Sequence, residues 1–427
     1  MAEPDTSGSP PDAEHSDDVE TPEISATPLL VPRDGVPNIS VSRSEIARAA
    51  DLLASGSGAF AVDAERASGF RYSNRAYLVQ IRRAGAGTVL IDPVSHGGDS
   101  VEVLAPVAQV LSEDQWILHA ADQDLPCLAE IGMRPPSLYD TELAGRLADL
   151  DRVNLASMVQ QLLGLALTKG HGAADWSKRP LPDEWLNYAA LDVEVLIELR
   201  DAIDAVLTAE GKDGWAREEF EYLRIAESTP TRRDRWRRTS GIHKVRDPRA
   251  LAAVRELWLT RDQIARRRDI APGRILPDSA IVNAATADPD TVEKLTALPI
   301  FGGARQRRSA SVWLDALARA RTADPPSSQE PSSGPPPASR WARRKPEAAA
   351  RLEAARAAIN ELAQQVSVPP ENLLAPDTVR RLCWDWVAVN DTTAAVEAFL
   401  DTTSARRWQR ELTTPVLTAA LESAPSD

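Results

Sequence analysis

Short apolar runs alternate with helical patterns along the first half of the chain. Four of these runs have the length and composition of strands: 59–63, 77–81, 88–92 and 116–119. Gly85 and Gly87 separate the second run from the third, and this arrangement predicts a β-hairpin. The fourth run leads into a helical pattern from about Asp122. Three strands, a helix, another strand and more helices indicate an α/β layer structure.

The second half of the chain carries helical patterns and no strand signal. Two helical blocks, at 240–321 and 346–424, are separated by a Pro/Ser-rich linker at 322–345. Residues 1–36 are acidic and Pro-rich without periodicity, and we expect them to be disordered. The pattern thus predicts an α/β domain at 37–226 followed by two small all-α domains.

Composition narrows the class of protein. A length of 427 residues with 26% charged and 43% hydrophobic residues is ordinary for a soluble protein of two or three domains. No apolar run approaches the roughly 18 residues of a membrane span, and the N-terminus lacks a signal-peptide pattern. Cys127 and Cys383 stand far apart, which excludes a disulfide framework or a cysteine-based zinc site. We expect a cytoplasmic protein with no membrane partner.

Charge is distributed unevenly. The net charge is −14, which taken alone argues against a nucleic-acid partner. Residues 230–321, however, carry 20 Lys or Arg residues against 10 Asp or Glu residues, a local balance of +10. This asymmetry indicates that one domain meets phosphates while another does something else.

Asp63 and Glu65 follow an apolar strand and are the first candidate chemical groups. Residues two apart on a strand point to the same face, so the two carboxylates converge. Converging acids raise each other's pKa unless a cation lies between them. The alternative is a solvated strand edge.

Three further residues follow in the same half of the chain. Asp124 stands where a helix begins, and since Asp122 is the better placed N-cap, Asp124 is left to point elsewhere. Tyr188 and Asp192 are four apart in a helical stretch and share one face, flanked by core-like positions. The alternatives are a capping acid and an ordinary amphipathic boundary. Together, four carboxylates and a phenol predict a pair of divalent ions that hydrolyse a phosphodiester.

The order and spacing of these motifs resemble the tyrosine-bearing branch of the DEDD exonuclease superfamily, specifically ribonuclease D. In that resemblance Asp63 and Glu65 match the first motif, Asp124 the second, and Tyr188 with Asp192 the third. It covers about residues 45–225, where 139–144 and 175–181 are also similar to the family.

The resemblance implies a specific structure and reaction. The fold would be a ribonuclease H-like α/β domain with a mixed sheet, followed by two HRDC-like helical domains in a ring or arch. Mg²⁺ or Mn²⁺ ions would be held by the four acids, with Tyr188 placing the water. RNA would be hydrolysed stepwise from its 3′ end to nucleoside 5′-monophosphates. The implied substrates are transfer RNA precursors and other small structured RNAs, and a monomer is favoured.

One position departs from the family pattern. Arg66 stands where the family usually has an aromatic residue after the glutamate, and Phe70 or Tyr72 would have to substitute for it. Asp140 and Glu142 form a second Asp-x-Glu pair, but they stand at the expected start of a helix, where acids favour the first turn. We therefore leave them out of the metal site.

Several residues are candidate RNA contacts, and for each of them a structural role without RNA is the alternative. Lys169 and His171, in a Gly-flanked loop ahead of Tyr188, would contact substrate or be ordinary exposed loop residues. A second candidate is a tryptophan among five arginines: Arg232, Arg233, Arg235, Trp236, Arg237 and Arg238. The arginines would contact phosphates and the indole would stack on a base. The alternative is a solvated connecting segment with one anchoring tryptophan. The basic block 240–321 resembles an HRDC domain, and residues 272–278 and 298–302 carry the resemblance. An HRDC domain here would hold the substrate and take no part in the chemistry.

Two rival functions remain open. One is a DNA 3′–5′ exonuclease of the same branch; the HRDC-like block without helicase motifs favours RNA but does not settle the choice of sugar. The other is a non-catalytic RNA-binding protein that retains the fold, and the complete acid set argues against it.

Overall fold

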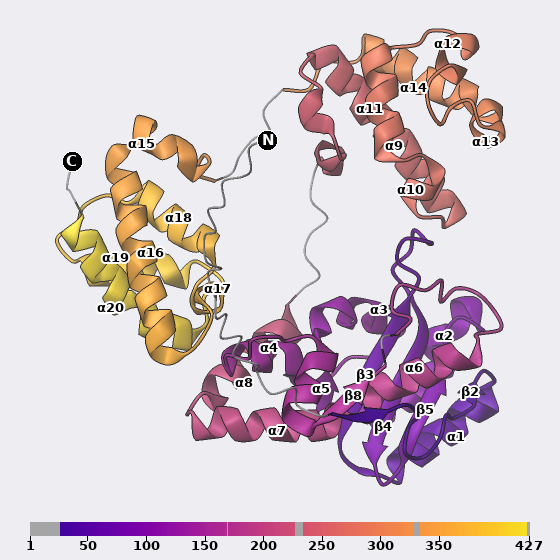
Figure 1. The fold of residues 1–427 in the computed structure, drawn as a ribbon, viewed down its shortest axis with the longest axis vertical. Coiled ribbons are helices and arrows are strands. Elements are labelled where there is room, and N and C mark those ends of the chain that lie inside the picture. Colours follow the sequence, from indigo (N-terminus) through magenta and orange to yellow (C-terminus); the bar gives the residue numbers. More distant parts are fainter. Residues whose placement is uncertain (1–25, 169, 227–233, 328–333, 425–427) are drawn as a thin grey trace, which may run out of the picture.

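The computed structural model describes residues 26–168, 170–226, 234–327 and 334–424. They form an α/β unit (26–226), a middle helical unit (234–322) and a C-terminal helical unit (338–424) (Figure 1). The strands of the α/β unit are β1 (Thr27–Leu29), β2 (Ile39–Ser40), β3 (Ser57–Arg66), β4 (Ala76–Ala84), β5 (Gly87–Ile91), β6 (Trp116–Leu118), β7 (Leu138–Asp140) and β8 (Leu165–Leu167). Its helices are α1 (Arg43–Ala54), α2 (Ser100–Leu111), α3 (Leu125–Glu130), α4 (Thr141–Leu147), α5 (Leu155–Leu163), α6 (Asp183–Glu194), α7 (Leu196–Ala209) and α8 (Asp213–Ile225), with 3₁₀ turns η1 (Gly97–Asp99) and η2 (Ala121–Gln123).

The central sheet is mixed and has the strand order β2-β5-β4-β3-β6-β7. The pairs β3–β4 and β4–β5 are antiparallel, and the latter is the predicted hairpin around Gly85 and Gly87. The remaining pairs, β2–β5, β3–β6 and β6–β7, are parallel. The expected mixed α/β sheet is thus confirmed, with the metal-motif strand β3 near its centre.

Helices cover both faces of this sheet. On one face, Val79 and Ile81 of β4 join a large buried cluster with residues of α1 and α2. On the other face, Leu78 packs with Ala189 and Ala190 of α6. Small residues let α6 approach the sheet closely, so a side chain on its inner face lies directly over β3.

Some elements were not predicted. β1, β2, β7 and β8 are only two or three residues long, too short to carry a period-two pattern. β1 pairs in parallel with β8, so the expected disordered tail is wrong for the described residues 26–36; the rest of it, 1–25, lies outside them.

The middle and C-terminal units are helical throughout their described residues. The middle unit contains η3 (Arg235–Arg238), η4 (Ile242–Lys244), α9 (Pro248–Arg268), α10 (Pro272–Ile275), α11 (Asp278–Ala287), α12 (Val292–Thr296), α13 (Ala304–Arg308) and α14 (Ala310–Thr322). The C-terminal unit contains η5 (Ala338–Arg340), α15 (Trp341–Arg344), α16 (Pro346–Val366), α17 (Pro370–Leu373), α18 (Pro376–Asp385), α19 (Thr392–Asp401) and α20 (Arg407–Ser423). Trp236 and Trp341 are core residues of these units, so both begin earlier than the expected boundaries at 240 and 346. None of the described helices combines the length and apolar character needed to cross a membrane.

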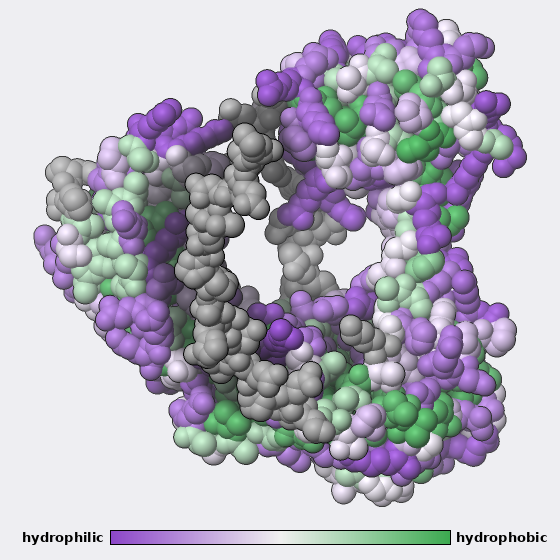
Figure 2. Space-filling view, viewed as in Figure 1, coloured by the Kyte–Doolittle hydropathy of each residue, from purple (hydrophilic) through white to green (hydrophobic). Residues whose placement is uncertain are grey.

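The three units surround an opening (Figures 1 and 2). The C-terminal unit joins the α/β unit through buried contacts: Trp408 stacks on Trp215 with ring centroids 4.9 Å apart, and its indole N–H donates to Glu219. The middle unit meets the α/β unit through the β3–β4 loop, where Ala271 N donates to Phe70 O at 3.0 Å and Arg274 Nε to Gly69 O at 2.7 Å.

Candidate active site

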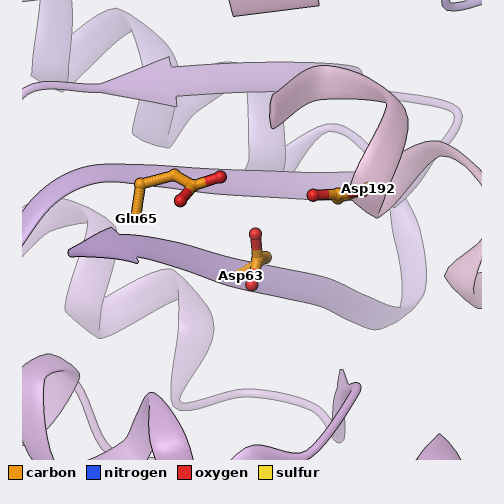
Figure 3. Close-up of side chains that lie close together, drawn as sticks. All are labelled: Asp63, Glu65 and Asp192. Carbon is orange, nitrogen blue, oxygen red and sulfur yellow. The ribbon is translucent and has the colours of Figure 1, made fainter. Parts of the chain in front are cut away.

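Asp63 and Glu65 lie on one face of β3, and their carboxylates approach each other (Figure 3). The partner of Asp63 on β4 is Gln80, which is fully buried and whose Nε2 donates to Asp63 Oδ2 at 3.1 Å. The pairing of the two strands thus fixes the orientation of the first acid. Gln80 was not singled out from the sequence, although a polar residue inside the apolar run 77–81 was a signal.

Asp192 reaches the same point from α6. One oxygen each from Asp63, Glu65 and Asp192 lies within 4.8 Å of the other two (Figure 3). Asp63 and Asp192 are 129 positions apart along the chain, and the packing of α6 on β3 brings them together. This spacing of oxygen atoms suits a hard divalent cation.

Asp124 completes the set from a third element. It precedes α3 at the N-cap position but makes no capping hydrogen bond, so its carboxylate is free to face the cavity. The expectation that Asp122 would cap this helix is wrong, because Asp122 lies within η2 and α3 begins at Leu125. Asp124 is 5% exposed, and Arg66 Nε lies 3.3 Å from its Oδ1.

Asp140 holds the turn that presents Asp124. Ala120 adopts a left-handed conformation with φ 56°, and Asp140 accepts hydrogen bonds from the N–H groups of Ala120 and Ala121 at 3.2 and 2.8 Å. Asp140 also caps α4 by accepting from Leu143 N, and Glu142 lies in the first turn, so the pair stands at the start of a helix as the sequence predicted. Its second role, in supporting Asp124, was missed because it depends on β6 and β7 lying side by side.

The acids destabilise one another's charged forms. Burial raises the pKa of Glu65 to about 10, with further contributions from Asp63, Asp192 and Asp124. Burial and then the charge of Asp63 raise the pKa values of Asp124 and Asp192 well above the usual range, and burial also raises that of Asp63. Such a cluster is most stable when protons or cations neutralise it.

Tyr188 lies one helical turn before Asp192, on the same side of α6. Burial, followed by the charges of Asp192 and Glu65, raises the pKa of its phenol. Tyr188 therefore remains protonated near neutral pH and can donate a hydrogen bond. Gly170 packs directly on its ring: a Cβ there would lie 1.6 Å from the Tyr188 ring, so the loop needs glycine at this position.

These side chains line one open cavity of about 400 Å³. Asp63, Glu65, Asp124, Tyr188 and Asp192 all contribute to its wall, together with Arg66, Gln123, His119 and the loop around Gly170.

The histidines near the cavity differ in their surroundings. His171 is half-buried and meets the Tyr188 ring edge-on, with centroids 6.0 Å apart. His119 contacts Thr141 Oγ1, and burial lowers its pKa to about 4, so its imidazole is neutral. Lys169 lies outside the described residues.

Residues 175–181 hold α6 against the sheet. Arg179 Nε donates to Asp92 Oδ2 at 2.6 Å and Nη2 donates to Tyr77 O at 2.7 Å, which ties the segment to the ends of β5 and β4. Trp176 is fully buried beside Trp185 of α6. The segment therefore positions Tyr188 and Asp192 without touching the cavity.

The basic segment 232–238 divides into exposed and buried parts. Trp236 is 3% exposed in the core of the middle unit, so the predicted stacking of a base on it is wrong, and the alternative of an anchoring tryptophan holds. Arg235 and Arg238 are exposed, and Arg237 is half-buried with its guanidinium 4.4 Å from the Trp236 ring. Arg232 and Arg233 lie outside the described residues.

Phe70 and Tyr72 do not replace the missing aromatic residue. The Phe70 ring lies 4.0 Å from the guanidinium of Arg274, and Tyr72 OH donates to Asp262. Both side chains belong to the contact with the middle unit. The residue that does face the acids is Arg66 itself.

Family models match three successive parts of the chain. Residues 39–208 match a model described as 3′-5′ exonuclease, and residues 250–317 match the HRDC domain. Residues 334–421 match a model described as 3′ to 5′ exonuclease C-terminal domain.

Solved structures share the whole arrangement. A protein from Bifidobacterium adolescentis is 36% identical with a TM-score of 0.82, over 93% of this chain and 100% of that one. RNase D from Escherichia coli, whose structure is described as that of an exoribonuclease involved in structured RNA processing, has a TM-score of 0.64 over 91% of this chain and 99% of its own. At 21% identity the second likeness concerns the fold alone.

The chain is also similar in sequence to curated proteins named ribonuclease D. The protein from Nitrobacter hamburgensis is 32% identical, over 49% of this chain and 55% of its own length. That from Acidiphilium cryptum is 31% identical over 274 residues, 61% of this chain and 68% of its own. The matches thus span about half to two thirds of the relatives. Together with the matches to the exonuclease and HRDC models, they show that this chain belongs to the ribonuclease D family.

Proposed function

We propose that the protein is a two-metal 3′–5′ exoribonuclease that releases nucleoside 5′-monophosphates. The observation that carries this proposal is the meeting of Asp63, Glu65 and Asp192 within 4.8 Å, in a cavity also lined by Asp124 and Tyr188. Buried acids with raised pKa values are costly unless a cation neutralises them. A phosphodiester, itself negatively charged, would enter such a cavity only with cations present.

The residues present fit a pair of divalent ions. All four acids offer carboxylate oxygens, which are the ligands that Mg²⁺ and Mn²⁺ prefer. Among the described residues, Asp124 Oδ1 is buried and accepts no hydrogen bond, as expected of an oxygen kept for a ligand. When bound, the ions would supply charge neutralisation for the phosphodiester and activation of water.

The protein's own groups would orient the reaction. Gln80 holds Asp63, and Asp140 holds the turn that bears Asp124, so two of the ligands are fixed before substrate arrives. Tyr188, kept protonated by its surroundings, would donate a hydrogen bond that aligns the attacking water. The Gly170 backbone on its ring restricts the phenol to one orientation.

RNA is the substrate that the family supports, with transfer RNA precursors and small structured RNAs as the proposed natural targets. The basic middle unit would hold the RNA behind its 3′ end through exposed residues such as Arg235 and Arg238. A cytoplasmic monomer is the state we propose.

The decisive experiment is digestion of matched RNA and DNA oligonucleotides, each labelled at the 5′ end, with Mg²⁺, Mn²⁺ or chelator. We expect a ladder of RNA products shortened from the 3′ end, with 5′-monophosphates released and no reaction in chelator. Faster digestion of DNA would favour the DNA exonuclease. Binding of RNA without cleavage under any metal condition would favour the non-catalytic protein.

Substitution of Arg235 and Arg238 together by Gln tests the holding role. The double variant should bind RNA more weakly and with a log–log salt slope reduced by about two, one for each lost phosphate contact. Arg48→Gln, at an exposed position of α1, is the matched control. An unchanged slope in the double variant would remove these residues from the RNA path.

A further inference from the structure

Arg66 is the charged residue of the cavity to which the proposed reaction gives no task. Its Nε lies 3.3 Å from Asp124 Oδ1, and its Nη2 donates to Gln123 Oε1 at 3.2 Å. The side chain is 21% exposed, whereas that of Asp124 is 6% exposed. The guanidinium therefore lies at the mouth of the cavity, between the acids and solvent.

The direction of this side chain departs from strand geometry. Arg66 follows Glu65 directly, and successive residues of a regular strand point to opposite faces. The register between β3 and β4 shifts at this position: Glu65 pairs with Leu78, but Arg66 pairs with Ala76. The extra residue, Tyr77, is on β4; such irregularities bend and twist the strand pair locally, and here Arg66, the last residue of β3, lines the same cavity as Asp63 and Glu65.

The contact between Arg66 and Asp124 is loose. The two groups form an ion pair, but Asp124 Oδ1 accepts no hydrogen bond from Arg66 or from any other described residue. Arg66 also has only one hydrogen-bond acceptor there, Gln123, although a guanidinium carries five N–H groups. Both partners thus have unused capacity. Two oxygens of a phosphate match the spare donors of the guanidinium in geometry and charge.

We infer that Arg66 is a phosphate-binding residue, which exchanges its guanidinium between Asp124 and a backbone phosphate next to the scissile one. This inference rests on the proposed function. A divalent ion on Asp124 would occupy the oxygen that Arg66 contacts and repel the guanidinium, which would then turn to the incoming phosphate. The same residue therefore competes with the metal for Asp124 in the absence of RNA and assists RNA binding when the metal is present.

The test uses the full chain with Arg66→Gln, which removes the charge, and Arg66→Lys, which keeps it without the planar fork. Arg134→Gln, at an exposed position outside the cavity, is the control. The first readout is Mn²⁺ binding without RNA, followed by electron paramagnetic resonance. We expect Arg66→Gln to bind Mn²⁺ about five- to tenfold more tightly, because a competing cation has gone. Unchanged or weaker binding would overturn the competition.

The second readout is cleavage of RNA oligonucleotides in which one linkage near the 3′ end carries an uncharged methylphosphonate. In the unsubstituted protein, neutralising the linkage that Arg66 contacts should raise KM about 10- to 100-fold, the usual strength of a charge-assisted contact. Arg66→Gln should show a raised KM with the ordinary substrate and no further loss with the modified one, and Arg66→Lys should regain part of the difference. Equal losses in the unsubstituted protein and Arg66→Gln at every linkage tested would overturn the phosphate contact.

These outcomes separate the inference from the function beneath it. If the unsubstituted protein fails to cleave RNA, the proposed function fails, while the Mn²⁺ titration still reports on Arg66. If it cleaves RNA and Arg66→Gln has an unchanged KM, only the inference on Arg66 fails.

Discussion

The α/β unit contains two Asp-x-Glu pairs that look alike in the sequence and differ in structure. Asp63 and Glu65 lie on a central strand, where the backbone N–H groups are engaged by neighbouring strands. Asp140 and Glu142 lie where β7 ends and α4 begins, beside backbone N–H groups for which Asp140 is the acceptor within the described part of the chain. The number of backbone donors, and not the spacing, separates the two pairs: N–H groups of Leu143, Ala121 and Ala120 stabilise Asp140, whereas Asp63 has only that of Ala64 among the described residues.

The pKa values express this difference. Burial raises the pKa of Asp140 only to about 6, because N–H groups of Leu143, Ala121 and Ala120 stabilise its charge. Glu65 lacks such donors among the described residues, and burial with three neighbouring acids raises its pKa to about 10. The first pair is therefore the one for which we propose bound cations, whereas backbone N–H groups and Arg146 already stabilise the charges of the second.

Asp63→Asn, in the first pair, should cause the largest loss of activity of the substitutions proposed in this comparison. The substitution keeps the contact with Gln80 but removes one metal-ligand charge, and we expect kcat to fall about 10³-fold or more. Thermal stability without metal should be unchanged or higher, since one repelling charge has gone. Activity assays and thermal denaturation measure both.

The control for this substitution is Asp122→Asn, at an exposed acid near Asp124 that does not line the cavity. It should retain nearly full activity. Equal losses in the two variants, or loss of RNA binding together with cleavage in Asp63→Asn, would contradict a metal-holding role for Asp63.

Asp140→Ala, in the second pair, should mainly lower the stability of the fold. It removes a helix cap and leaves the N–H groups of Ala120 and Ala121 without their acceptor, which should lower the free energy of unfolding by about 2–4 kcal/mol. Because the same turn carries Asp124, Mn²⁺ affinity should also fall, by about 10- to 100-fold. Urea denaturation and Mn²⁺ titration measure the two effects. Lost activity with unchanged stability would make Asp140 a member of the metal site instead.

Much of this comparison could be predicted from the sequence. The Asp-x-Glu spacing and the strand period place Asp63 and Glu65 on one face, and the preference of acids for the first turn of a helix separates Asp140 and Glu142 from them. The structure confirms the hairpin, because apolar runs such as 77–81 and the glycines between them carry their own signal, and it confirms the mixed sheet that the family resemblance implied.

The remainder depended on contacts between distant segments. The missed strands β1, β2, β7 and β8 form because a neighbour pairs with them, as β8 does with β1, and their own residues carry no distinct strand pattern. The direction of Arg66 depends on a register shift against β4, and the role of Trp236 depends on the packing of the middle unit. Alternation alone would have pointed Arg66 away from Asp124.

The pH dependence of metal binding sharpens the comparison between the pairs. The folded-state pKa of Glu65, about 10, lies above its ordinary value of 4.5. Its contribution to stability is therefore greatest below pH 4.5 and declines as the pH rises toward 10. Metal binding must displace these protons, so affinity should increase by up to about tenfold per pH unit for each proton released. Added Mg²⁺ or Mn²⁺ should accordingly raise the melting temperature more at pH 8 than at pH 6, and a shift independent of pH would contradict the raised pKa values.

Glu142→Ala should have the smallest effect. Glu142 forms an ion pair with Arg146 at 2.6 Å across one turn of α4, and both side chains are partly exposed. Solvent screens such pairs, so the free energy of unfolding should change by no more than about 0.5 kcal/mol and kcat by less than twofold. Urea denaturation and the RNA assay check both values, with Asp140→Ala as the contrast. A tenfold loss of activity would mean that the second Asp-x-Glu pair reaches the active site through its glutamate, and that free backbone donors do not separate the two pairs.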